Sequence, residues 1–129
     1  MEAVNALAHH ERLRSRGSIR RLFEAGKSGF VYPLRYMWIA DEVSTECQST
    51  SAEVLFTVPK RFHKRANRRN LLRRRIKEAY RLNKEIVISS GAKSYSIDLA
   101  IVYSTKEVQT YKTINNAVRK ILDSIAQEL

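Results

Sequence analysis

The sequence predicts an α+β fold, a layered α/β sandwich in which a small mixed sheet packs with three helices. Three features favour it: strand-like runs of alternating apolar residues, two long segments with apolar residues at helical spacing, and the element order αββαβα. The chain has 129 residues, a usual size for one domain. We therefore expect a single domain over residues 1–129, with residues 1–11 flexible because they show no clear pattern.

A short helix is predicted over residues 18–25. Ser18 is of a type that caps helix N-termini, and Gly26 is of the type that most often ends helices. The apolar residues of this helix share one face, which is made of Ile19, Leu22 and Phe23.

Two strands are predicted next. Residues 30–40 alternate at period 2, with one side made of Phe30, Tyr32, Leu34, Tyr36 and Trp38. Pro33 has no N–H to donate, so we expect its end of the strand at a sheet edge or a bulge. Residues 52–58 form the second strand. Because the polar loop over residues 41–51 is moderately short, we expect the two strands to pair as a hairpin.

The second half of the chain predicts a helix, a strand and a helix. The first helix runs from Asn67 or Arg68 to Lys84 and on into residues 86–88. Residues 96–104 form a strand that is apolar on both sides, as is typical of a central, buried strand. Residues 110–128 form the closing helix, whose apolar stripe consists of Ile114, Ala117, Val118, Ile121, Leu122 and Ile125.

Composition excludes several classes of protein. The longest uncharged apolar runs are far shorter than the roughly 20 residues of a membrane span. The N-terminus lacks the basic and long apolar regions of a secretory signal. Cys47 is the one cysteine and cannot form an internal disulfide, and no Cys/His cluster has metal-ligand spacing. We therefore expect a reduced, cytoplasmic protein with no membrane contact and no metal or cofactor of its own.

The positive charge of the chain is concentrated in one segment. The formal net charge is +11, and residues 60–84 account for it with twelve Lys and Arg against one acid, Glu78. The remaining residues balance to zero, although residues 12–27 carry a smaller local excess. Charge that serves solubility would be spread out. A concentrated excess is typical of a protein that binds a polyanion.

The helix predicted over this segment separates its charge from its apolar residues. Leu72, Ile76, Ala79 and Tyr80 form a stripe that can face a core. With about 100° of rotation per residue, the opposite face is about 100° wide and has Glu78 at its edge. It bears one amide and five cations, namely Asn70, Arg73, Arg74, Lys77, Arg81 and Lys84.

Three interpretations of this face are open. A merely solvated face would usually mix charge signs, and a helix that binds a membrane or a calmodulin-like partner would carry bulkier apolar residues. Arginine outnumbers lysine eight to four in residues 60–84, and arginine suits bidentate contacts with phosphate and stacking on bases. We therefore favour a nucleic acid as the partner.

No catalytic site is predicted from the protein's own side chains. His9, His10 and His63 are not spaced with carboxylates in any recognisable acid–base or triad order. Asp98 lies within a predicted strand, where we expect a hydrogen-bonded or edge-exposed carboxylate.

The stretch from Val58 to Lys84 resembles the signature of the bacterial ribonuclease P protein component. That family has a basic connector ending in Ala, here residues 60–66, followed by Arg-Asn-Arg-(Ile/Leu)-Lys-Arg at the start of a helix. Leu71 departs from the pattern, because the family usually has Arg or Lys there; the matching residues are Arg69, Asn70, Leu72, Arg73 and Arg74. The resemblance covers residues 10–125 and implies a left-handed βαβ crossover, where pattern alone predicts a right-handed one.

The resemblance implies an accessory subunit of an RNA-based endoribonuclease. The catalytic RNA of ribonuclease P uses Mg²⁺ to hydrolyse precursor tRNA at the 5′ end of the mature tRNA, and no chemistry is expected from the protein alone. The implied partners are this RNA and the 5′ leader of precursor tRNA, with no obligate protein partner. The residues expected to bind the catalytic RNA are Lys60, Arg61, Lys64, Arg65, Arg68, Arg69, Asn70, Arg73, Arg74, Lys77 and Arg81.

The resemblance also implies a separate cleft, lined by the first helix and the sheet, that holds the single-stranded 5′ leader. Contact with the leader is implied to raise substrate affinity and to assist metal binding. Six residues are candidates for it: Arg12 and Arg14 for charge, and Ile19, Phe23, Tyr36 and Trp38 for apolar contact and stacking. Stacking suits a leader whose sequence varies. Family position favours Ile19 and Phe23, whereas Tyr36 and Trp38 can equally be core residues of a strand.

Two other function classes remain open at the level of the residues. One is an RNA-binding module with no cleavage partner, such as a ribosome-associated protein or an RNA chaperone. The other is a self-contained protein nuclease. Cleavage of precursor tRNA, with and without the catalytic RNA, distinguishes all three.

Overall fold

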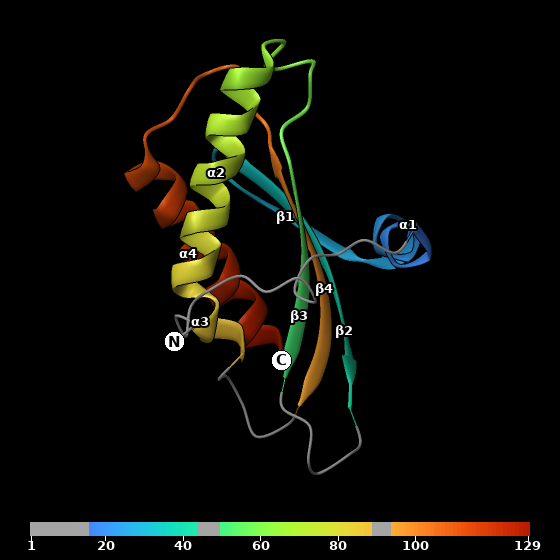
Figure 1. Ribbon diagram of the computed structural model, residues 1–129. Coiled ribbons are helices and arrows are strands. Elements are labelled where there is room, and N and C mark those ends of the chain that lie inside the picture. Colours follow the sequence, from blue (N-terminus) through green and yellow to red (C-terminus); the bar gives the residue numbers. More distant parts are fainter. Residues whose placement is uncertain (1–15, 44–49, 89–93) are drawn as a thin grey trace, which may run out of the picture.

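The computed structural model of the protein describes residues 16–43, 50–88 and 94–129. It confirms the expected α+β fold, in which helices cover both faces of a four-stranded mixed sheet (Figure 1). In chain order the elements are α1 (Arg16–Ala25), β1 (Lys27–Val31), β2 (Leu34–Glu42), β3 (Ser51–Thr57), α2 (Ala66–Asn83), α3 (Glu85–Ile88), β4 (Tyr95–Tyr103) and α4 (Tyr111–Glu128).

The order of strands in the sheet is β1-β2-β4-β3, and it overturns the expected hairpin between residues 30–40 and 52–58. β4 lies between those two strands, antiparallel to β2 and parallel to β3. Parallel neighbours need a long crossover, and α2 provides it. The unit β3–α2–β4 is therefore the βαβ crossover of the fold, and its left-handedness stays an implication of the family resemblance.

The expected single strand over residues 30–40 is two strands, β1 and β2, which turn back on each other at Tyr32 and Pro33. The peptide bond between these two residues is cis. Pro33 has no backbone N–H, and at the turn it does not have to donate one to the sheet. Its carbonyl accepts a hydrogen bond from the N–H of Ser104 at 2.9 Å. Because a two-residue turn reverses the alternation, Phe30 lies opposite Arg35 in the register and not on the side of Leu34 and Trp38.

α1 begins two residues earlier than expected, at Arg16, so Ser18 lies inside the helix and is not its N-cap. The expected end at Gly26 is confirmed. The N–H of Gly26 donates to the carbonyl of Leu22 at 2.9 Å. A Cβ at Gly26 would stand 2.4 Å from that same carbonyl oxygen, so only glycine fits between α1 and β1.

α2 and α4 pack side by side on one face of the sheet, and α1 lies on the other (Figure 1). The predicted stripes of both long helices are buried, as are Ile97, Leu99, Ile101 and Tyr103 of the central strand β4. α2 ends at Asn83, and the predicted continuation into residues 86–88 is the separate short helix α3. The large core is therefore the layer between the sheet and the pair α2 and α4.

Candidate nucleic-acid interface

The basic connector is folded back onto the start of α2. Arg65 precedes the helix in an extended conformation and makes no side-chain cap. The side chain of Arg69 donates from Nη1 to the carbonyls of His63 (3.3 Å) and Lys64 (2.9 Å). The buried His63 ring lies tilted against the Tyr103 ring, with ring centres 5.5 Å apart, and its Nε2 is 2.8 Å from the carbonyl oxygen of Thr105. Arg69, predicted to bind RNA, thus has its guanidinium positioned against the protein backbone.

The expected RNA-binding side chains gather along the connector and the side of α2 that faces away from the sheet. Seven are exposed, namely Lys60, Arg61, Lys64, Arg65, Arg68, Asn70 and Arg74, and four are half-buried, namely Arg69, Arg73, Lys77 and Arg81. Arg73 donates from Nη1 to Oδ1 of Asn70 at 3.3 Å. We call Asn70, Arg73, Arg74 and Lys77 the cationic face of α2.

Two cations of the predicted face, Arg81 and Lys84, do not add free positive charge to the surface of α2 in the way that the sequence analysis expected. Arg81 makes a two-pronged ion pair with Glu78, with nitrogen–oxygen distances of 2.6 and 3.0 Å. These hydrogen bonds lower the pKa of the Glu78 carboxyl, so its negative charge offsets that of Arg81 at neutral pH. Lys84 is only 5% exposed, at the junction of α2 and α3. The expectation of an uninterrupted row of cations is therefore wrong at the C-terminal end of α2.

A shallow groove opens beside the N-terminal turns of α2. It encloses about 360 Å³ and is lined by Arg65, Asn67, Arg68, Leu71 and Val108. Leu71, the departure from the family pattern, therefore joins Val108 of the β4–α4 loop as the apolar part of an otherwise polar groove. Sequence reasoning did not foresee this groove, because Val108 is far from α2 along the chain.

On the other face of the sheet, α1 packs through the fully buried Leu22. Arg21 binds Asp41 of β2 with two hydrogen bonds of 2.7 and 2.8 Å. At about 100° per residue, Ile19 and Phe23 lie on the flank of α1 opposite Arg21. Ile19 is half-buried, and Phe23 is 54% exposed. Both candidates for the leader cleft thus share one flank of α1, and Phe23 is open to a ligand.

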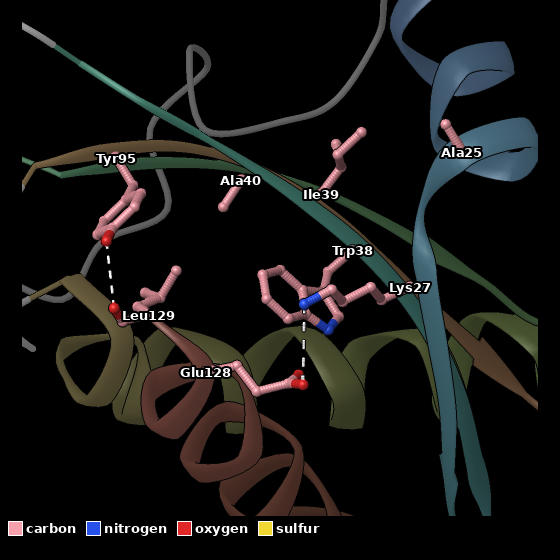
Figure 2. Close-up of a pocket in the computed structure, with 8 residues that line it drawn as sticks. All are labelled: Ala25, Lys27, Trp38, Ile39, Ala40, Tyr95, Glu128 and Leu129. Carbon is pink, nitrogen blue, oxygen red and sulfur yellow. Dashed lines mark hydrogen bonds and ion pairs between the residues drawn. The ribbon is translucent and has the colours of Figure 1, made fainter.

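Tyr36 and Trp38 do not join that flank. Figure 2 shows Trp38 and Ile39 pointing to opposite sides of β2, with Trp38 toward α4. Trp38 is 4% exposed and borders a pocket of about 210 Å³, where the ammonium of Lys27 lies 5.2 Å from its ring centre and 3.8 Å from Glu128. The ring of Tyr36 covers Gly29 on the same side. Both residues belong to the α4 side, which corrects their assignment to a cleft beside α1.

The β2 residues that share the α1 side are Arg35, Met37, Ile39 and Asp41, and of these Met37 and Ile39 pack against α1. Sequence reasoning did not propose them because it sought stacking surfaces among the aromatic residues on the opposite side of the strand. Among the remaining cleft candidates, Arg12 and Arg14 lie outside the described residues.

Asp98 lies on this side too, half-buried in the central strand and not at an edge. Burial raises the pKa of its carboxyl, and the neighbouring carboxylate of Glu53 raises it further, while Arg21 opposes them. Within the described ranges, His, Cys, Asp and Glu side chains do not gather in threes that could hold a metal ion. No helix in this part of the chain is both long and apolar enough to cross a membrane.

Comparisons with known proteins agree with the geometry. The family model of ribonuclease P matches residues 7–126. The chain is 32% identical over 126 residues to the ribonuclease P protein component of Porphyromonas gingivalis, covering 96% of this chain and 89% of that protein. It is 33% identical over 111 residues to that of Chlorobaculum tepidum, covering 80% and 70%.

Solved structures share the fold at lower identity. The ribonuclease P protein from Thermotoga maritima superposes with a TM-score of 0.67 at 23% identity, covering 89% of this chain and 97% of that one. The protein from Staphylococcus aureus does so with a TM-score of 0.66 at 16% identity, covering 88% and 94%.

Proposed function

Because this chain belongs to the ribonuclease P protein family and is thus a protein subunit of that ribonuclease, we propose that it binds the catalytic RNA through the cationic face of α2 and the basic connector. The observation that carries the proposal is the division of α2 into two sides. Leu72, Ile76, Ala79 and Tyr80 are buried, and the cations project away from them. Packing of the buried side offsets the mutual repulsion of the cations, and a phosphate backbone would remove that repulsion.

Arginine contacts of this kind recognise a folded RNA by its backbone. Guanidinium groups pair with phosphate oxygens in bidentate geometry, and each phosphate neutralised releases counterions. Arg69 supports the contact indirectly, because it holds the connector carbonyls of His63 and Lys64 against the helix. The connector cations are then presented next to the cationic face of α2.

We propose further that the flank of α1 with Ile19 and Phe23, together with Met37 of the sheet, binds the single-stranded 5′ leader of precursor tRNA. Phe23 is exposed, and Met37 is half-buried beneath α1. Aromatic stacking holds a base without reading its identity. Contact with the leader would raise substrate affinity and assist metal binding in the holoenzyme.

Phosphodiester hydrolysis in this scheme is carried out by the catalytic RNA with Mg²⁺. Lys and Arg side chains dominate the proposed interface, and a guanidinium cannot serve as a general base at neutral pH. The protein's part is to bind and position the two RNAs. A cytoplasmic location remains our prediction.

Reconstitution tests the proposal. The protein is mixed with catalytic RNA and precursor tRNA at low Mg²⁺, and 5′ cleavage is followed over time. We expect stimulated cleavage in the mixture and none by the protein alone. Binding without stimulation would favour an RNA-binding module without a cleavage partner, and cleavage by the protein alone would indicate a catalytic site in the protein.

A further inference from the structure

A second exposed aromatic side chain lies on the α1 side of the sheet. Phe30 of β1 is 53% exposed and is paired in register with Arg35 of β2. The guanidinium carbon of Arg35 lies 5.9 Å from the centre of the Phe30 ring, within the range of a cation–π contact. Arg35 lies on the same side of β2 as Met37 and Ile39, which pack against α1. Phe30 is opposite Arg35 in the register, so both members of the pair face the side of the sheet that α1 covers.

The Phe30 ring is braced by its neighbours. Tyr32 stands edge-on to it, with ring centres 6.5 Å apart. The Tyr32 hydroxyl in turn donates to Oε2 of Glu107 at 3.2 Å and accepts from Nε2 of Gln109 at 3.0 Å. An exposed ring that is already held in place loses little conformational freedom when a ligand covers it.

The position of α1 brings Phe23 toward this pair. In Figure 1, α1 is seen nearly end-on, whereas the strands are seen along their length. The helix axis therefore crosses the direction of the strands. Arg21 reaches Asp41, at the end of β2 that is paired with the start of β4. The opposite flank, with Phe23, therefore faces the other end of the sheet, where Phe30 and Arg35 lie.

On the α1 side of the sheet, the charge differs between the two ends of the strands. Arg35 is in register with Val102 of β4, which is in register with Thr57, the last residue of β3 before the connector. Arg35 thus lies at the end of the sheet from which the basic connector leaves. The carboxylates that share this side, Asp41, Glu53 and Asp98, lie toward the other end. A polyanion on this side is therefore drawn toward Arg35 and the connector.

From this arrangement we infer that Phe30 and Arg35 form a nucleobase-stacking site, which extends the leader cleft from Phe23 toward the basic connector and takes a single-stranded nucleotide of the 5′ leader. The inference rests on the proposed function. Phe30 stacks on the base, and Arg35 supplies positive charge for the adjoining phosphate. Bases on Phe23 and on Phe30 belong to one continuous strand of leader.

Binding by the reconstituted holoenzyme tests the inference. Affinity is measured for precursor tRNA, for a series with the leader shortened one nucleotide at a time, and for mature tRNA. Phe30→Ala is expected to weaken binding of the full-leader precursor by about 5- to 150-fold, the range for loss of one base–aromatic stack, and to leave mature tRNA unchanged. The loss should disappear once the leader is too short to reach Phe30.

Two further variants separate stacking from simple burial of an apolar side chain. Phe30→Tyr keeps an aromatic ring and is expected to retain affinity, whereas Phe30→Leu keeps apolar area without the ring and is expected to lose most of it. Leu82→Ala removes a side chain that is 46% exposed on α2, away from the cationic face, and serves as the matched control. Urea denaturation of each variant checks that the fold is intact.

Phe23→Ala distinguishes failure of this inference from failure of the proposed function. If Phe23→Ala weakens only leader-bearing substrate and Phe30→Ala has no effect, the stacking site at Phe30 is refuted and the leader cleft stands. If neither variant has a leader-dependent effect, both are refuted. A concentration-dependent dimer in sedimentation that Phe30→Ala abolishes, without a leader effect, would assign Phe30 to self-association instead.

Discussion

The two sides of the sheet differ in how completely they are covered. On one side two helices of 18 residues each, α2 and α4, bury a continuous cluster that includes residues of β2, β3 and β4. On the other side a helix of ten residues, α1, forms a small cluster around the fully buried Leu22 and Ala100, with Met37, Ile39 and Leu55 half-buried. The first side stabilises the fold, and the second leaves sheet surface accessible to a ligand.

The difference also explains where each proposed RNA contact lies. The catalytic-RNA contact uses the outer surface of α2, whose inner surface is part of the large core. The leader contact uses the incompletely covered sheet side and the exposed flank of α1. In these proposals the catalytic RNA binds outside a packed layer, and the leader binds on the side of the sheet that α1 covers only in part.

The largest expected effect comes from opening cavities on both sides. Ile76→Ala removes a fully buried side chain of α2, and Leu22→Ala does the same in α1. We expect Ile76→Ala to lower the free energy of unfolding toward the upper end of about 2–5 kcal/mol, and Leu22→Ala toward the lower end, because its half-buried neighbours can relax into the space. Urea denaturation measures both values. An equal or larger loss for Leu22→Ala would contradict the comparison.

Removing cations from α2 should abolish much of the catalytic-RNA contact without affecting the core. The triple variant Arg73→Ala, Arg74→Ala and Lys77→Ala is expected to bind catalytic RNA more weakly. The slope of log affinity against log salt should fall by roughly two to three, at about 0.7–0.9 per phosphate contact.

A matched control removes the same net charge elsewhere. Lys112, Arg119 and Lys120 are exposed on α4, and their replacement by Ala changes the total charge of the protein equally. Filter binding over a salt series should show a smaller change in slope for this control. Equal changes would mean that total charge, and not the cationic face of α2, determines RNA binding.

Replacing Leu71 by Arg, which the family pattern has at this position, should add about one phosphate contact to the binding of catalytic RNA. Leu71 lines the groove together with Arg68 and Val108, so Leu71→Arg adds a guanidinium to the surface proposed to contact the RNA. We expect tighter binding of catalytic RNA and a salt slope steeper by roughly 0.7–0.9. Leu82→Arg on the same helix is the control for added charge. If Leu71→Arg weakens binding, the apolar groove itself contacts the RNA.

The smallest effect concerns Asp98 on the α1 side. Because the pKa of Asp98 is raised in the folded protein, the folded state binds this proton more tightly than the unfolded state does. Its ionisation therefore costs stability above the folded pKa and costs none below the ordinary value of 3.8. Asp98→Asn should raise stability at neutral pH by at most about 0.5 kcal/mol. Thermal unfolding should show this gain at neutral pH and no gain below pH 3.8.

The long helices and the central strand could be predicted because their patterns are local. The apolar stripes of α2 and α4 repeat at helical spacing, over Leu72–Tyr80 and Ile114–Ile125, and β4 is apolar on both sides. The pairing of β4 with β3 and β2 joins residues distant in the chain, so no local pattern encodes it. Loop length favoured a hairpin, and the crossover through α2 overrode it.

The candidate site was predictable where it depends on composition and not where it depends on a turn. Arg73, Arg74 and Lys77 follow from helical spacing alone. The two-residue turn at Pro33 reverses the alternation of side chains, which moves Phe30 to the side of Arg35 and leaves Trp38 in the core. The pairing of Arg81 with Glu78 was also missed, although a separation of three residues on a helix permits it.

The length of α2 has a consequence for what the protein can discriminate. Its 18 residues span about 27 Å at about 1.5 Å per residue, and Arg73 and Lys77 are about one turn apart. The buried stripe anchors the helix to the sheet, so this spacing cannot adjust to a partner. In the proposed contact, an RNA must bring its phosphates to fixed intervals along α2. The helix would then select an RNA by the path of its backbone in space and not by the order of its bases.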